Sequence, residues 1–197
     1  MTDQRQWVAF AETSRIVAGE PATVASAIKQ WQAQADNKPV LVFDRADGRV
    51  IDLDLRGTES EVAARYGSPL PGSVVEVSRD RGRPKLGVTS REVTLLPRHW
   101  DWLAEQQGGA SGTLRRLVDA AIRDRRGADQ VRRATEAAYR FMSALAGDLQ
   151  EFEEASRALF AGDRVGFKAR TSEWPDDVRA ELGRFVELVF GNEETQP

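Results

Sequence analysis

The middle of the chain contains a short extended segment followed directly by two helix patterns, and this order restricts the fold more than any other feature. Residues 91–97 read Arg-Glu-Val-Thr-Leu-Leu-Pro, which is typical of a short strand that the proline ends. The same proline suits the first turn of a helix over 98–107, and two glycines stop this helix before a second one over 111–125. A lone strand leaves its backbone groups without partners, so the segment predicts pairing with a second copy.

Both helix patterns carry apolar residues on one side. In the second helix, five apolar residues recur at the spacing of a single helical face: Leu114, Leu117, Val118, Ala121 and Ile122. Ser111 is a suitable N-cap for this helix. The first helix places Trp100, Leu103 and Ala104 on one face. Trp102 cannot point to the same core as Trp100, so one of the two tryptophans is a candidate interface anchor.

Positive charge is concentrated around this segment, although the chain as a whole carries a net charge of −3. Residues 79–126 hold 11 Lys and Arg against 6 Asp and Glu, a net charge of +5. The flanking residues 1–78 and 127–197 have net charges of −3 and −5. Such asymmetry indicates an anionic partner, and the alternative is a solvated surface on an arginine-rich protein.

A basic stretch with glycine and proline, over 79–90, precedes the expected strand. Its centre is the sequence Arg81, Gly82, Arg83, Pro84 and Lys85, of which the first four residues match the core of the AT-hook. In that motif an extended backbone lies in the narrow A·T minor groove, and two arginines follow the groove floor, where the negative potential is deepest. Because the motif is so short, an exposed basic linker is the alternative interpretation.

The order strand, proline, helix, glycine pair and helix over 91–125 resembles the ribbon-helix-helix family of repressors. In that fold two chains pair their strands into a ribbon that enters the DNA major groove, and the helices interlock around it. The resemblance implies a homodimer that binds DNA. It also implies that the N-terminus of the second helix grips a phosphate, through the amides near Ser111, Gly112 and Thr113, with Arg115 and Arg116 following.

Two registers of the strand remain open, because strand side chains alternate between faces. In the register of the family, the residues that face the groove are Arg91, Val93 and Leu95. A shift of one residue replaces them by Ser90, Glu92 and Thr94. The aliphatic set can contact only thymine methyls, and the glutamate of the other set repels phosphates. Either the basic arm therefore supplies most of the DNA contact, or the segment serves only for dimerisation.

The parts before and after this segment read as ordinary packed structure. In the first part, strands are predicted at 8–10, at Ile16, at 39–43, at 50–55 after an Asp47-Gly48 turn and at 74–77, with helices from Pro21 and over 58–66. The last of these helices starts with Thr58 and Glu61 at the spacing of a capping box. The C-terminal part is helical, with an apolar stripe from Val131 to Leu145 and a last helix from 174 on. Two Ala-Gly-Asp segments predict helix ends, with Asp148 and Asp163 as the next N-caps.

The amino-acid composition argues against several classes of function. The chain has no cysteine and its one histidine is His99, so thiolate metal sites, most zinc sites and the usual serine triad are not expected. No convergent nucleophile, base or metal set is found, so we expect a non-enzymatic protein with no cofactor, no metal site and no catalytic residue. The chain begins without a signal-peptide core and has no membrane-spanning run, which predicts a cytoplasmic protein with no membrane partner.

The whole chain also resembles an uncharacterised family of bacterial proteins of unknown function. This resemblance rests on the segment from Gly82 to Gly87, on Glu92 to Leu103, and on Ala138 to Met142 with the two Ala-Gly-Asp segments. It implies no activity.

The sequence thus predicts an α+β protein: a small α/β unit over 1–78, a basic arm or linker over 79–90, a ribbon-helix-helix-like dimerisation segment over 91–126 and a helical region over 127–197. The expected function is that of a homodimeric DNA-binding protein, a transcriptional regulator or nucleoid-associated protein, with the arm in an A·T-rich minor groove. The alternative is a dimeric scaffold, a protein-interaction module that binds no DNA.

Overall fold

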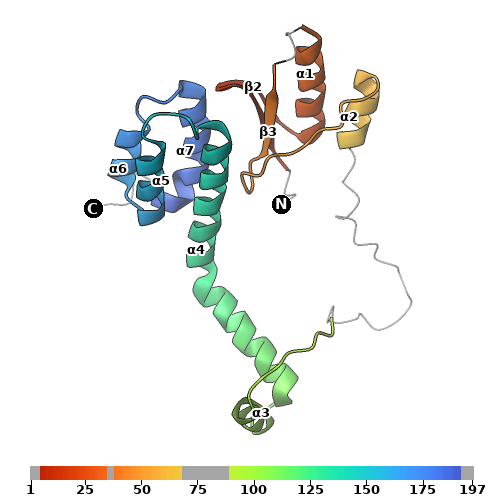
Figure 1. Ribbon diagram of the computed structural model, residues 1–197. Helices are drawn as coiled ribbons and strands as arrows, with labels where there is room; N and C mark the ends of the chain where they lie inside the picture. The colour runs from red at the N-terminus through yellow and green to blue at the C-terminus, as the bar shows by residue number, and fades with distance from the viewer. Residues whose placement is uncertain (1–4, 35–37, 68–88, 192–197) are drawn as a thin grey trace. The chain divides into compact units, whose positions relative to one another are not determined.

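The computed structural model describes residues 5–34, 38–67 and 89–191 (Figure 1). The chain divides into two units, of which the first joins residues 1–73 to residues 129–197 and the second spans residues 74–128. Its described elements are three antiparallel strands and seven helices, which confirms the α+β class. The strand predicted at 74–77 and the basic arm over 79–90 lie outside the described residues.

The sheet of the first unit has the strand order β2-β1-β3. Strands β1 (Trp7–Ala11), β2 (Ser14–Gly19) and β3 (Val40–Asp44) confirm the strands that the sequence predicts around 8–10, Ile16 and 39–43. Strand β1 is central, pairs antiparallel with both neighbours and is buried over its whole length. Because side chains alternate along it, Val8 and Phe10 belong to one hydrophobic core, and Trp7 and Ala9 belong to another.

Helices cover both faces of this sheet. Helix α1 (Pro21–Gln34) packs Val24 and Ile28 into the core that contains Trp7, and α2 (Glu59–Gly67) lies beside α1. On the other face, Phe141 of α4 (Gly109–Leu145) lies 5.6 Å from Phe10, centroid to centroid, in an edge-to-face contact. The rest of that core comes from α5 (Phe152–Ala161), α6 (Arg164–Arg170) and α7 (Asp176–Phe190). Figure 1 shows the sheet between these two groups of helices.

The predicted hairpin forms its turn but not its second strand. Gly48 has a φ of +69°, a conformation that glycine adopts without strain, and Val50 forms an isolated antiparallel bridge with Phe43. Residues 51–55 then run without a strand, which corrects the prediction. The amide of Ile51 still donates to the carbonyl of Val42 at 2.8 Å, but the amide of Asp54 donates to the hydroxyl of Tyr66 at 2.7 Å and not to a ladder partner.

Two of the four predicted helix caps are confirmed, and both lie in the first unit. In the capping box of α2, the amide of Thr58 donates to Glu61 Oε2 at 2.7 Å, and the amide of Glu61 donates back to Thr58 Oγ1 at 3.3 Å. The pKa of Glu61 is lowered below its ordinary value, mainly by the bond from the Thr58 amide. Asp163 caps α6, since its carboxylate accepts from the amide of Gly166 at 2.9 Å. Asp148 is not a cap, because α5 begins only at Phe152.

Helix α4 is longer than the sequence predicts. The expected break between a helix over 111–125 and a C-terminal stripe from 131 is wrong, because α4 is continuous over 37 residues. Its only glycine between these two patterns is Gly127, and a glycine inside a helix costs only about 1 kcal/mol relative to alanine. The charged residues around Gly127 belong to a stretch that is polar on all sides, as is common where a helix connects two units.

Candidate functional site

The described part of the second unit consists of α3 (Pro97–Ala104), a short turn and the first half of α4. Pro97 occupies the first turn of α3, as predicted, and the helix ends three residues earlier than the expected Gln107. Gly108 and Gly109 have φ values of +87° and +67°. This backbone region is open to glycine at little cost, so the glycine pair produces the turn that the sequence predicts between the two helices.

This part of the chain has almost no core of its own. Among the described residues 89–128, only Leu103 and Thr113 are buried, with 2% and 4% of their surface exposed. Seven large apolar side chains in the same stretch are exposed, each by 42% or more: Val93, Leu96, Trp100, Trp102, Leu117, Val118 and Ile122. We call these seven residues the apolar surface. So many exposed large apolar side chains in 40 residues are unusual on a monomer and are typical of an interface.

The apolar surface includes the stripe that the sequence predicts on the second helix. Leu117, Val118 and Ile122 are 49%, 54% and 57% exposed, and Leu114 is half-buried. The spacing of these residues is therefore that of a helix with one packed face. The described residues of the chain do not cover this face. Both tryptophans of α3 are exposed, so the second unit offers two aromatic anchors where the sequence predicts one.

The strand predicted over 91–97 is not formed in the single chain. Residues 91–96 carry no regular secondary structure before α3 begins at Pro97. Arg91 and Val93 are exposed and Leu95 is half-buried. Leu96, which the favoured register turns toward a core, is 50% exposed. A strand at this position needs the backbone groups of a second strand as hydrogen-bond partners. The sequence predicts no such strand nearby, which agrees with the lack of a strand in the single chain.

The N-terminus of α4 differs from the prediction by two residues. Because the helix begins at Gly109, Ser111 lies in its first turn and is not the N-cap. The amides of Gly112 and Thr113 already belong to the intrahelical ladder, and the first-turn amides are those of residues 109–111. The amide of Gly109 donates to the carbonyl of Gln106 at 3.1 Å. A phosphate at this helix end would therefore meet the amides of Ala110 and Ser111.

Several arginines of the second unit lie on α4. Arg116 Nη2 donates to the carbonyl of Gln107 at 2.6 Å and to Thr113 Oγ1 at 3.0 Å, which ties the turn to the helix. These bonds use one nitrogen of a guanidinium that has five N–H donors. Arg115 is exposed and its Nε donates to the carbonyl of Ser111 at 3.2 Å. Arg123 lies two helical turns beyond Arg116, on the side of α4 roughly opposite the stripe.

Other kinds of site find little support in the described part of the chain. No group of three His, Cys, Asp or Glu side chains there could hold a metal ion. Asp54, whose pKa is lowered mainly by the side-chain bond from Arg56, is an exposed carboxylate beside α2. None of the described helices is long and apolar enough to cross a membrane. The predicted arm residues lie outside the described residues.

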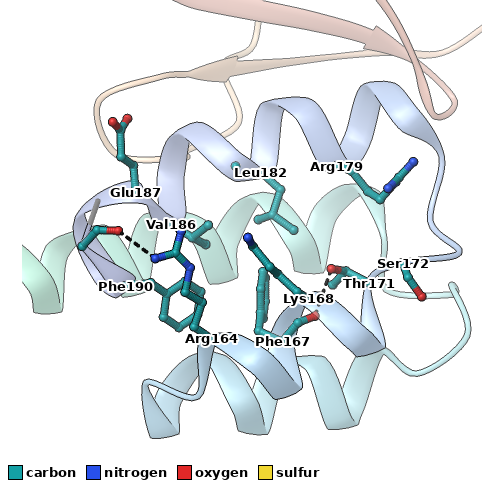
Figure 2. Close-up of a pocket in the computed structure, with 12 residues that line it drawn as sticks. Arg164, Phe167, Lys168, Thr171, Ser172, Arg179, Leu182, Val186, Glu187 and Phe190 are labelled. Carbon is teal, nitrogen blue, oxygen red and sulfur yellow. Dashed lines mark hydrogen bonds between the residues drawn. The ribbon is translucent and has the colours of Figure 1, made fainter. Parts of the chain in front are cut away.

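One feature of the first unit was not visible in the sequence. A groove between α6 and α7 has an apolar floor with basic side chains around it, and Figure 2 shows its lining. Arg164 and Lys168, one helical turn apart on α6, are the only sequence signal for it. Two cations at that spacing are far more common on a solvated helix face than at a binding site, so the pattern alone does not identify the groove.

The comparisons with known proteins identify the family of the chain. A family model described as "Uncharacterized protein conserved in bacteria (DUF2239)" matches residues 6–186. The chain belongs to this family. The matched range of DUF2239 includes the second unit as well as both parts of the first, which confirms the predicted membership of an uncharacterised bacterial family. No curated protein and no solved structure matches the chain.

Proposed function

We propose that this protein is a homodimeric DNA-binding protein whose second unit forms the dimer and presents basic residues to the duplex. The observation that carries the proposal is the apolar surface of that unit, which has seven exposed large side chains and only two buried residues over 89–128. The described residues of this unit bury too little to offset the entropy of ordering their backbone, so we infer that a partner covers them.

A second copy of the chain is the partner that fits this surface best. The layout of extended segment, proline, helix and helix is that of a ribbon-helix-helix chain, in which each copy completes the core of the other. Pairing of residues 91–96 with their symmetry mates would satisfy the backbone groups of both strands. Each side chain of the apolar surface is about half exposed, so burying one such side chain in the dimer contributes roughly 1 kcal/mol.

The charge distribution supports DNA as the ligand of this dimer. Residues 79–126 have a net charge of +5 between two acidic parts of the chain. In the proposed complex Arg81 and Arg83 enter an A·T-rich minor groove. Arg91, Arg115 and Arg116 contact phosphates beside it. Preference for narrow A·T-rich grooves with little base reading suits a nucleoid-associated protein or a regulator of many sites.

Fluorescence polarisation with labelled A·T-rich and G·C-rich duplexes, at two salt concentrations, tests the proposal. We expect saturable binding that weakens with salt and favours the A·T-rich duplex. Arg83→Ala should weaken binding, reduce the A·T preference and lower the magnitude of the slope of log K against log salt by about one. The matched control is Arg157→Ala, which removes an exposed arginine of α5 in the first unit and should change none of these values.

The same titration distinguishes the second candidate function, a dimeric scaffold for another protein. The observation in its favour is that Val93 and Leu95 occupy positions where DNA-reading ribbons carry polar side chains. A dimer that binds neither duplex at low salt, where the electrostatic contribution is largest, would replace the DNA proposal by the scaffold.

A further inference from the structure

The groove between α6 and α7 combines an apolar floor with a cationic rim. Its volume is about 690 Å³, within the usual range for small-molecule sites of about 300–1,000 Å³. All its lining residues belong to the first unit, so it is independent of the proposed dimer and DNA surfaces. We propose that this groove binds a small organic anion with an apolar body, such as an aryl or acyl carboxylate.

The floor supplies the apolar half of this recognition. Phe167 and Leu182 are 3% and 2% exposed and belong to the main core, so they form a fixed surface. Phe190 packs its ring 5.3 Å from that of Phe167, and Val186 lies one helical turn before Phe190 on α7. Aromatic and aliphatic walls of this kind bind the body of a ligand through dispersion and release of water.

The rim supplies the charged half. Among the described lining residues, Arg164 and Lys168 on α6 and Arg179 on α7 are cationic, and Glu187 is acidic. Figure 2 shows the Lys168 ammonium extending toward the groove. Arg164 is held at one end through a bond from Nη1 to the Gly191 carbonyl at 3.4 Å. These cations already have contacts within the chain, and a ligand carboxylate would bind through their remaining N–H donors.

Arg179 is positioned at the other end of the groove. Its Nε donates to the carbonyl of Trp174 at 3.0 Å, and its Nη2 pairs with Asp176. Both contacts are made to residues at the start of α7 or just before it. The guanidinium is therefore ordered before any ligand binds, which lowers the entropy lost when a carboxylate docks against it.

A glycine in the wall keeps the groove open. Gly183 lies in the middle of α7, where glycine is less favourable than alanine, and it lines the groove. A Cβ built at Gly183 meets no atom within 4 Å, so packing does not require glycine there. A larger side chain at this position would occupy the space of a ligand. The glycine therefore costs helix stability and in return leaves room for an occupant.

Amide NMR of the full-length protein, titrated with 4-phenylbutanoate and with the neutral 4-phenylbutanol, tests this proposal. We expect the acid to shift amides of α6 and α7 around the groove, and the alcohol to bind at least about tenfold more weakly, because charge-assisted bonds to the rim are lost. Lys168→Gln should weaken binding of the acid and leave binding of the alcohol unchanged. Arg157→Gln, which removes an exposed cation of α5, should affect neither.

Gly183→Leu is the decisive variant, because it fills the groove while improving helix propensity. It should abolish binding of the acid without lowering the midpoint of thermal unfolding. Equal binding of acid and alcohol, unchanged binding by Gly183→Leu, or shifts confined to residues 89–128 would overturn the proposal. So would shifts of the same amides by an acidic, leucine-rich peptide when the carboxylate produces none, because the occupant would then be a protein segment.

Discussion

The buried carboxylate of Glu181 gives the sharpest test of how the first unit is held together. Its side chain is fully buried in α7, and it accepts bonds from Arg45 Nε at 2.7 Å and Nη2 at 2.5 Å. Arg45 directly follows β3, 136 residues earlier in the chain, so this pair joins the sheet to the C-terminal helices. Two further guanidinium groups, those of Arg15 and Arg184, lie 3.8 Å and 3.9 Å from the carboxylate.

We predict that Arg45→Met lowers the free energy of unfolding by about 3 kcal/mol. Removing one partner of a buried ion pair leaves an uncompensated charge, which typically costs about 3–5 kcal/mol. The lower end of this energy range applies to Arg45→Met, because the Arg45 side chain is 16% exposed and solvent screens the ion pair. Arg15 and Arg184 also remain near the carboxylate. Methionine keeps the apolar stem of the side chain, so the loss reports on the charge and the two hydrogen bonds.

Urea unfolding of the wild type, of Arg45→Met and of the double variant Arg45→Met with Glu181→Leu gives the assay. The double variant should regain most of the lost stability, because an apolar pair of similar volume replaces the ion pair without leaving a buried charge. A loss below about 1 kcal/mol for Arg45→Met, or a double variant less stable than the single one, would show that Arg45 does not compensate a buried charge on Glu181.

Four further predictions concern single side chains. Gly48→Ala should destabilise by at least about 2 kcal/mol, because its φ is +69° and a Cβ would lie 2.2 Å from a carbonyl oxygen of α4. Gly162 has a similar φ of +68° but open space around the Cβ, so Gly162→Ala should lower the free energy of unfolding by less. The difference between the two variants in the same urea assay gives the contribution of the clash. Thr58→Ala should cost about 1 kcal/mol through loss of the N-cap. The stability gap between the wild type and Glu61→Ala should narrow as the pH falls below 4.5, because the folded-state pKa of Glu61 is depressed and protonation removes its contribution. Ile122→Asp should shift the protein from dimer to monomer in sedimentation velocity, because it puts a charge into the apolar surface.

Matched controls decide between these effects and general destabilisation. Val165→Asp introduces the same charge at an 80% exposed apolar residue of the first unit and should leave the dimer intact. If Gly162→Ala and Gly48→Ala cost the same, the clash with α4 is absent. A constant gap for Glu61→Ala from pH 7 to pH 3 would contradict the ionised capping box.

The sequence predicts the elements of the first unit where local signals act alone. Strand β1 and the capping box of α2 are read directly from apolar runs and cap residues. The second strand of the hairpin is missed because a distant hydroxyl, that of Tyr66, takes the amide of Asp54. The continuity of α4 is missed because a glycine among charges resembles a helix end, although no proline stops the helix.

The candidate sites show the same difference between features that local sequence signals predict and features that depend on the fold. The apolar surface was predictable, since the spacing of Leu117, Val118 and Ile122 already indicates a face that must be covered. The buried Glu181 and the groove beside α6 were not, because both depend on residues that only the fold brings together. Glu181 on α7, and Arg164 and Lys168 on α6, have the sequence pattern of an ordinary solvated surface.

Sedimentation equilibrium of a fluorescein-labelled A·T-rich duplex with the full-length protein measures DNA binding and stoichiometry together, because the mass of the labelled species reports both. At low salt and micromolar protein, we expect a species containing one duplex and two chains of 21.9 kDa each. Ile122→Asp should reduce the population of that species. A duplex that sediments with its own mass at every protein concentration would rule out DNA binding, and a complex containing a single chain would rule out the dimer.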